Sequence, residues 1–113
     1  MKARLPQGYG AKPSDMNKMF RKVQDDMAAL EEEHAAREFS AQSGGGMVDV
    51  TVNGGGEIKA INLNPEVVDP EDTEMLSDLL IAALNEAFRS AKDTHDADLE
   101  KITGGLNLPG GLF

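Results

Sequence analysis

Side chains able to do acid–base or nucleophilic chemistry are few in this sequence, and they lie far apart. The two histidines, His34 and His95, fall in different predicted helices, cysteine is absent, and no serine occupies a G-x-S-x-G turn. Catalysis needs a nucleophile, a base and an orienting group held together. The sequence therefore predicts a protein that is not an enzyme, with no catalytic residues, no cofactor and no small-molecule substrate.

Two other motifs have an ordinary structural explanation. Asp93 and Asp96 share a helix face, but they lack the spacing of an EF-hand or an H-E-x-x-H site, so we expect no metal there. Gly54–Gly56 precedes a strand and lacks the Lys-Ser/Thr pair of a phosphate-binding loop, which favours a hairpin turn. His34 occupies an apolar helix position and is predicted to be packed or interfacial.

Positive charge is concentrated at one end of the chain. Residues 1–22 hold six basic side chains against one acidic, whereas residues 23–113 hold five against nineteen, and the formal net charge is −9. Lys18, Arg21 and Lys22 fall within an arc of about 100° on a helix. This patch suits contact with phosphate groups, although three charges on an exposed face are also common as solubilising residues. Any nucleic-acid site in so acidic a chain has to be local.

The helix that would carry this patch is predicted over about residues 15–36, with Ser14 as its N-cap. Its apolar positions recur with alternating spacings of four and three residues, and this stripe is expected to pack while the basic face meets solvent. A stripe so narrow suits another helix or a partner subunit. The stripe consists of Met16, Phe20, Val23, Met27, Leu30 and His34.

Three strands are predicted after this helix. Val48, Val50 and Val52 alternate with polar residues, which is typical of a half-buried strand. Residues 38–42 form a weaker candidate before it, and residues 57–63 can return after the glycine turn. The sequence thus predicts a three-stranded antiparallel meander.

A second long helix is predicted from the run Asp69-Pro70-Glu71-Asp72, with Asp69 as N-cap and Pro70 at the first helical position. If the helix continues to Thr103, it would be about 50 Å long at a rise of about 1.5 Å per residue, which exceeds the width of such a sheet. Its second half is expected to project or to pack on another subunit. Arg89 and Lys92 would join the basic patch if this helix ends near it.

Length and composition predict one small α+β domain of 12.1 kDa. Only 4% of the residues are aromatic, so the core is expected to be thin, and a second copy could complete it. We predict a flexible basic arm over 1–13, a single domain over 14–103 and a flexible tail over 104–113. The chain shows no signal peptide and no apolar run of about 18 residues, so we expect a cytoplasmic protein with no membrane segment.

Several sequence runs, in the same order over nearly the whole chain, carry a family resemblance. They are Gly44–Gly54, Ile58–Pro65, Glu74–Ala87 and Gly105–Gly110. Together they resemble the YbaB/EbfC family of bacterial nucleoid-associated proteins. The resemblance implies a homodimer of α-β-β-β-α subunits with long protruding helices, which binds duplex DNA with little sequence preference. It also implies an alteration of DNA conformation, a link to gene regulation and a place in the nucleoid.

The resemblance attributes DNA contacts to the protruding helices. Lys18, Arg21 and Lys22 match that region, and Lys12 in the arm and Lys92 in the last helix are added as candidate contacts. No base-reading residues accompany them, so phosphate contacts are expected.

A second hypothesis is an acidic dimeric adaptor, or chaperone-like interaction module, that does not bind DNA directly. In that case the acidic surface and an apolar tail would recruit an unidentified protein partner. The apolar side chains of that tail are Leu106, Leu108, Leu112 and Phe113.

Overall fold

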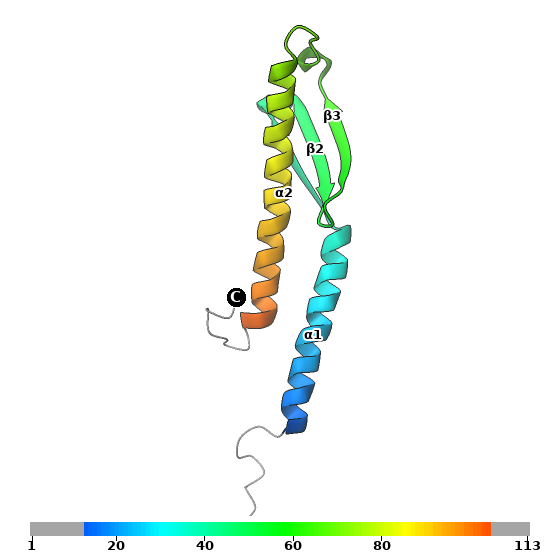
Figure 1. Ribbon diagram of the computed structural model, residues 1–113, viewed down its shortest axis with the longest axis vertical. Helices are drawn as coiled ribbons and strands as arrows, with labels where there is room; N and C mark the ends of the chain where they lie inside the picture. The colour runs from blue at the N-terminus through cyan, green and yellow to red at the C-terminus, as the bar shows by residue number, and fades with distance from the viewer. Residues whose placement is uncertain (1–12, 105–113) are drawn as a thin grey trace, which may run out of the picture.

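The computed structural model describes residues 13–104, so residues 1–12 of the arm predicted over 1–13 and residues 105–113 of the tail predicted over 104–113 lie outside the described residues. Two helices flank one three-stranded sheet, in the order helix, three strands, helix. The predicted α-β-β-β-α subunit of the α+β class is therefore confirmed. The molecule is elongated, with the sheet at one end and α1 at the other (Figure 1).

Helix α1 spans Pro13–Ala36. The prediction of Ser14 as N-cap is wrong, because the helix already begins at Pro13. Proline suits a first helical position, since its fixed φ angle is helical and its missing N–H group has no partner to lose there.

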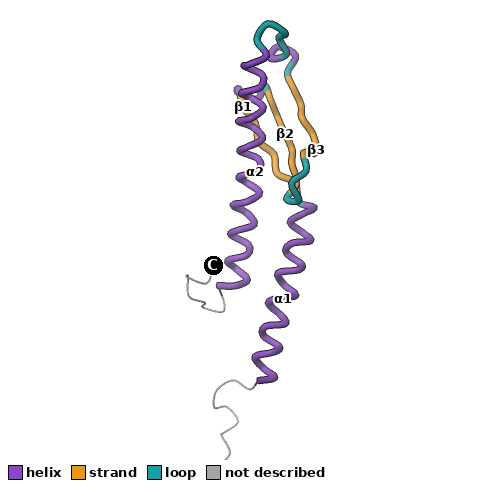
Figure 2. Tube along the Cα trace, viewed as in Figure 1, coloured by secondary structure: helices purple, strands orange, loops and turns teal. Residues whose placement is uncertain are grey.

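The sheet is a meander in which the central strand pairs antiparallel with both neighbours (Figure 2). Strand β1 spans Glu38–Ser43, β2 spans Val48–Asn53 and β3 spans Ile58–Leu63. The β1–β2 connection is a short turn of Gly44, Gly45 and Gly46, which all have positive φ angles. Glycine suits these positions because side chains disfavour the left-handed region. The predicted meander is thus confirmed.

The β2–β3 turn is held by Asn53, which is buried. Its side-chain oxygen accepts a 2.9 Å hydrogen bond from the Glu57 backbone N–H, and its amide nitrogen donates a 2.8 Å bond to the Glu57 carboxylate. The buried amide is therefore satisfied. Gly56 completes the turn with a φ angle of 92°. The predicted hairpin turn over Gly54–Gly56 is confirmed.

Helix α2 spans Thr73–Thr103, three residues shorter at its start than predicted. The assignment of Asp69 as N-cap is wrong. Asp69 instead closes a turn, where its side chain accepts a 2.9 Å bond from the Glu71 N–H. Asp72 is the N-cap and accepts a 3.2 Å bond from the Met75 N–H. Asp69 and Asp72 both carry side chains that can cap a helix. Because Asp69 forms a turn instead, the helix starts after Asp72.

The core lies between α2 and the first two strands. Apart from Phe39, it is built from small side chains: Val48, Val50, Val52, Val67, Ala83, Ala87 and Ala91. Alanines on α2 let the helix lie close to the valines of β2, and the largest fully buried side chains are valines. The thin core predicted from the composition is therefore confirmed.

The second half of α2 packs against α1 of the same chain (Figure 1). His95 on α2 contacts the carboxylate of Glu31 on α1, and Arg37, just after α1, lies 3.6 Å from the Asp98 carboxylate. The two helices run antiparallel, and α1 continues well past the end of α2 (Figure 1). The expected projection of the last helix is thus replaced by an α1–α2 pair from which α1 projects.

Candidate nucleic-acid interface

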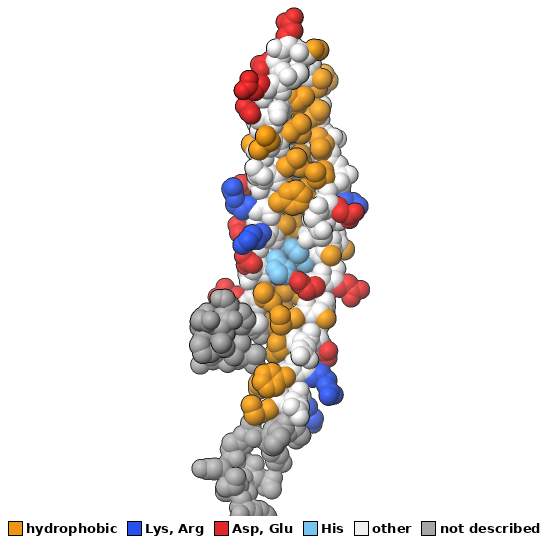
Figure 3. All heavy atoms as spheres, in the orientation of Figure 1, with side chains coloured by type: hydrophobic (Ala, Val, Ile, Leu, Met, Phe, Trp, Pro, Cys, Tyr) orange, Lys and Arg blue, Asp and Glu red, His pale blue; other side chains and the backbone are white. Residues whose placement is uncertain are grey.

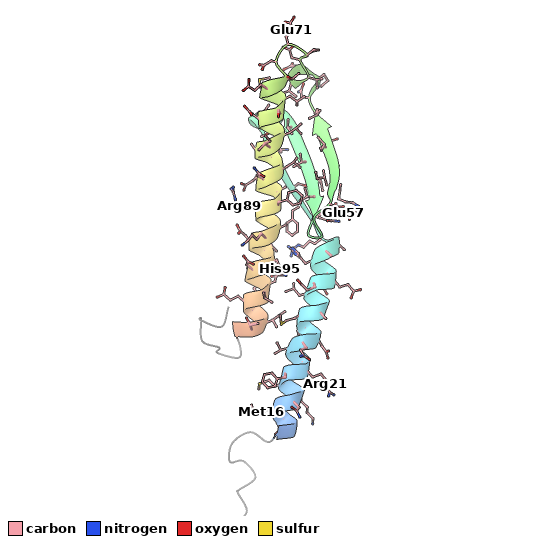
Figure 4. All side chains as sticks on the ribbon, in the orientation of Figure 1. Met16, Arg21, Glu57, Glu71, Arg89 and His95 are labelled. Atoms are coloured by element: carbon pink, nitrogen blue, oxygen red, sulfur yellow. The ribbon has the colours of Figure 1, made fainter. Side chains whose placement is uncertain are left out.

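The basic patch lies on the part of α1 that extends beyond α2. Lys18, Arg21 and Lys22 are all exposed, and Arg21 projects from the distal half of α1 (Figure 4). At about 100° per residue, their face is opposite to the apolar stripe of α1. The predicted placement of all three residues on one exposed helix face is confirmed.

Two of these three charges are available for an external anion. Lys22 forms an exposed ion pair with Asp26, with 3.1 Å between the ammonium and the carboxylate. Over residues 13–104, Lys18 and Arg21 form no such pair with a carboxylate. An exposed i,i+4 pair contributes only about 0.3–0.5 kcal/mol, so Lys22 can exchange Asp26 for a phosphate at little cost.

The opposite end of the molecule is acidic. Residues 60–88 carry seven carboxylates and no basic side chain. Acidic side chains accordingly gather at the sheet end of the molecule, and Glu71 stands at its extreme (Figures 3 and 4). The charge asymmetry along the sequence thus becomes an asymmetry along the long axis, with the basic patch at the far end of α1.

The basic side chains of α2 are paired within their own helix. Arg89 lies 2.8 Å from the Glu86 carboxylate, and Lys92 lies 3.0 Å from that of Asp96. The hydrogen bond to Asp96, with the added charge of that group, raises the pKa of the Lys92 ammonium above its ordinary value. The positive charges of Arg89 and Lys92 are therefore partly balanced by neighbouring carboxylates.

Lys92 is not brought next to the patch on α1. It lines a hollow with His34, Gly54 and His95, at the end of α1 that adjoins the sheet. Lys18 lies near the other end of α1, sixteen residues before His34, which is about 24 Å at the usual rise of about 1.5 Å per residue. Lys12 lies outside the described residues. The candidate contacts that the structure unites are Lys18, Arg21 and Lys22.

A histidine pair joins the two helices where the sheet begins. His34 is buried, as its place in the stripe predicts, and its ring lies 4.8 Å from that of His95 and 5.5 Å from that of Phe39, measured between centroids. Gly54 packs against His34 so closely that a Cβ atom there would overlap its backbone carbonyl. No sequence pattern indicates this pairing, because the two histidines meet only through the packing of α1 on α2.

Among residues 13–104, no three His, Asp or Glu side chains are placed to hold a metal ion. Asp96, which shares a helix face with Asp93, is instead the partner of Lys92. In the same part of the chain, neither helix combines the length and hydropathy needed to span a membrane.

Helix α2 covers the apolar face of the sheet over β2 but leaves the part over β3 uncovered by the described residues. Ile61 and Leu63 of β3 stand opposite Val50 and Val48 of β2, so they point to the same side of the sheet. The valines are fully buried under α2, whereas Ile61 and Leu63 remain 43% and 38% exposed. Hydrophobic side chains accordingly form a long stripe on the face of the molecule beside α2 (Figure 3).

The fold and the charge distribution define a class: a small α+β protein with a partly open apolar sheet face and an exposed basic patch at the tip of a projecting helix. The model of the YbaB/EbfC DNA-binding family matches residues 10–106. The chain belongs to this family.

Similar proteins carry a consistent description. The chain is 45% identical over 103 residues to a nucleoid-associated protein of Clostridium kluyveri, covering 91% of this chain and 90% of that protein. It is also 45% identical to a nucleoid-associated protein of Acetivibrio thermocellus, covering 94% of each. The fold is similar to that of the uncharacterized protein HP0035 from Helicobacter pylori, with a TM-score of 0.64, 25% identity, and coverage of 78% of this chain and 92% of that chain.

Proposed function

We propose that this protein binds duplex DNA through contacts between phosphate groups and the tip of α1, as a nucleoid-associated protein with little sequence preference. The observation that carries the proposal is the concentration of Lys18, Arg21 and Lys22 on one exposed face at one end of an otherwise acidic molecule. Family membership makes DNA the expected polyanion. Lys12 and Lys92 remain candidate contacts of lesser weight.

The composition of the patch supports phosphate contacts over base recognition. Reading base edges in the major groove calls for side chains such as Arg, Asn or Gln held in register with the bases. The exposed patch offers two lysines and one arginine on a single helix tip. Contacts of this kind position a protein on DNA and carry little sequence information. Such binding would alter DNA conformation and gene regulation without a defined operator.

We also propose that the working form is a homodimer, with the uncovered face of β3 as the contact between the two copies. Ile58, Ile61 and Leu63 present large apolar side chains, and β3 is an edge strand with unpaired backbone groups. A second copy would cover this face and present two basic tips to one duplex. Two tips engage more phosphates than one. The added contacts are needed because a chain with a net charge of −9 is repelled by DNA as a whole.

The DNA proposal is tested with a labelled 30-base-pair duplex, titrated by fluorescence anisotropy at several salt concentrations. The Lys18→Ala, Arg21→Ala, Lys22→Ala variant should bind at least about tenfold more weakly. Its salt slope should fall by roughly one for each phosphate that the variant no longer engages.

The matched control removes the same number of positive charges elsewhere, as Lys59→Ala, Arg89→Ala, Lys101→Ala. Because both variants have the same net charge, a loss confined to the first one assigns binding to the tip. Equal losses in both variants would show that only total charge matters and would overturn the assignment.

The dimer proposal is tested by sedimentation at micromolar concentration. The natural protein should sediment as a dimer, whereas Ile61→Asp should shift the equilibrium toward monomer by at least about thirtyfold, since it buries a charge at the contact. Asn62→Asp places the same carboxylate on the other face of the strand and should leave the dimer intact. A natural protein that sediments as a monomer would contradict the proposal.

A further inference from the structure

The distal half of α1 carries an apolar strip that no described residue covers. Met16, Met19 and Phe20 are 45%, 56% and 55% exposed. The sequence predicts that this stripe packs on another helix or a partner subunit, and within the described residues only part of it does so. The reason is geometric, because α2 ends at Thr103 while α1 continues beyond it (Figure 1). Helix α2 thus covers only the part of the stripe nearest the sheet.

The exposed strip is distinct from the basic patch. Met16 lies near the far end of α1 (Figure 4), and Phe20, four residues further on, lies about one turn away on the same side of the helix. Lys18 and Arg21 lie on the opposite side. A phosphate bound by the patch therefore leaves the strip uncovered, and the strip needs an apolar occupant of its own.

The chain leaves α2 next to this strip. A hollow at the end of α2 is lined by Ile102 and Asp98 from α2 and by Asp26 and Leu30 from α1. From there, the axis of α2, if extended, would run alongside the distal half of α1 (Figure 1). The next residues of the chain, 105–113, therefore start beside the end of the strip.

The composition and length of residues 105–113 fit the strip. Their sequence is GLNLPGGLF, in which four of nine residues are large and apolar and no side chain is charged. Nine extended residues reach about 30 Å. The helix from Asp26 to Met16 rises about 15 Å, so the segment is long enough to cover all of the strip.

We propose that residues 105–113 lie along the strip of Met16, Met19, Phe20 and Val23 on α1 of the same chain. Attachment at Gly104 gives the segment an effective concentration in the millimolar range at its own α1, which favours it over another copy or another protein. Its apolar side chains would take the place that α2 leaves empty and brace the projecting half of α1. The segment would thereby hold the basic face on the other side of that helix in position.

The first test uses the methionine methyl groups as probes. Two methionines, Met16 and Met19, lie on or beside the strip, whereas Met47 and Met75 lie in the sheet end of the molecule. In the full-length chain without DNA, Leu106→Ser with Leu108→Ser should shift the methyl NMR signals of the first pair and leave the second pair unchanged.

The matched control is Asn107→Ser, between the two leucines, which should shift neither pair. Unchanged Met16 and Met19 signals in the leucine variant would overturn the proposal. Because no DNA is present, this outcome is separate from any failure of DNA binding.

The second test identifies which chain supplies the segment. The natural sequence lacks cysteine, so two introduced cysteines report on one contact only. Val23→Cys with Leu108→Cys should form an intramolecular disulfide at least about tenfold faster than Arg21→Cys with Leu108→Cys, because Arg21 faces the other side of the helix. Equal rates would overturn the docking. A disulfide formed only between chains would overturn the same-chain assignment and identify a second copy as the source.

Discussion

The two ends of this molecule are stabilised in different ways. The sheet end buries Val48, Val50 and Val52 under the alanines of α2, and its surface is acidic. The distal half of α1 contains no buried residue within the described range and carries the basic patch. Packing thus holds one end, whereas the other relies on helix propensity, local ion pairs and whatever covers its apolar strip. The end that contributes least to stability is the end that we propose binds DNA.

The largest expected effect lies at the joint between the two regions. Gly54→Ala would place a Cβ atom against the His34 backbone carbonyl and 2.7 Å from its ring nitrogen Nε2, so α1 has to move away from the turn. We expect a loss of about 3 kcal/mol in unfolding free energy, measured by urea denaturation. Gly55→Ala is the control, since the Cβ atom added there would lie 3.4 Å from the Ala35 carbonyl oxygen and would not overlap it. Similar stability of the two variants would contradict the proposed importance of this close contact.

A second prediction compares the same substitution in both regions. Val50 is fully buried, whereas Val23 is partly exposed on α1. Val50→Ala should cost about 2 kcal/mol of unfolding free energy, because it removes buried methyl groups and leaves a cavity. Val23→Ala should cost less than about 0.7 kcal/mol, since alanine has the higher helix propensity and the described residues bury the valine side chain only in part. Equal costs would show that the distal half of α1 is as well packed as the sheet end.

Most of the fold follows from local patterns in the sequence. The alternation of Val48, Val50 and Val52 identifies the central strand, and the glycine triplets identify both turns. The error at Asp69 arose because a capping carboxylate in a turn and one at a helix start look alike, and Asp72 lies only three residues further on.

The packing of one element on another cannot be predicted from such local patterns. No periodicity states where a helix lies across a sheet, so the exposure of Ile61 and Leu63 could not be foreseen. For the same reason the sequence does not show that Phe20 lies beyond the end of α2, because the spacing of apolar residues identifies a helix face and not the point where a second helix ends. The patch of Lys18 and Arg21 is predictable, since helical geometry alone fixes their common face.

The smallest expected effect concerns the balance of charge at the basic end. Asp26→Asn would release Lys22 from its 3.1 Å ion pair and remove a negative charge near the patch. Affinity for the 30-base-pair duplex should rise roughly two- to threefold at low salt, and the gain should fade as salt is added. Asp78→Asn makes the same charge change at the acidic end and should leave affinity nearly unchanged. Equal gains would indicate that location along the molecule is unimportant.

The most direct test of the central claim is lysine protection. Lysines of the free and the DNA-bound protein are acetylated briefly, and modification at each position is measured by mass spectrometry. Contact through the tip of α1 predicts strong protection of Lys18 and Lys22 on DNA and none of Lys59, which is exposed on the sheet. Protection of Lys59 with Lys18 and Lys22 still reactive would contradict the claim that the basic end of α1 binds DNA.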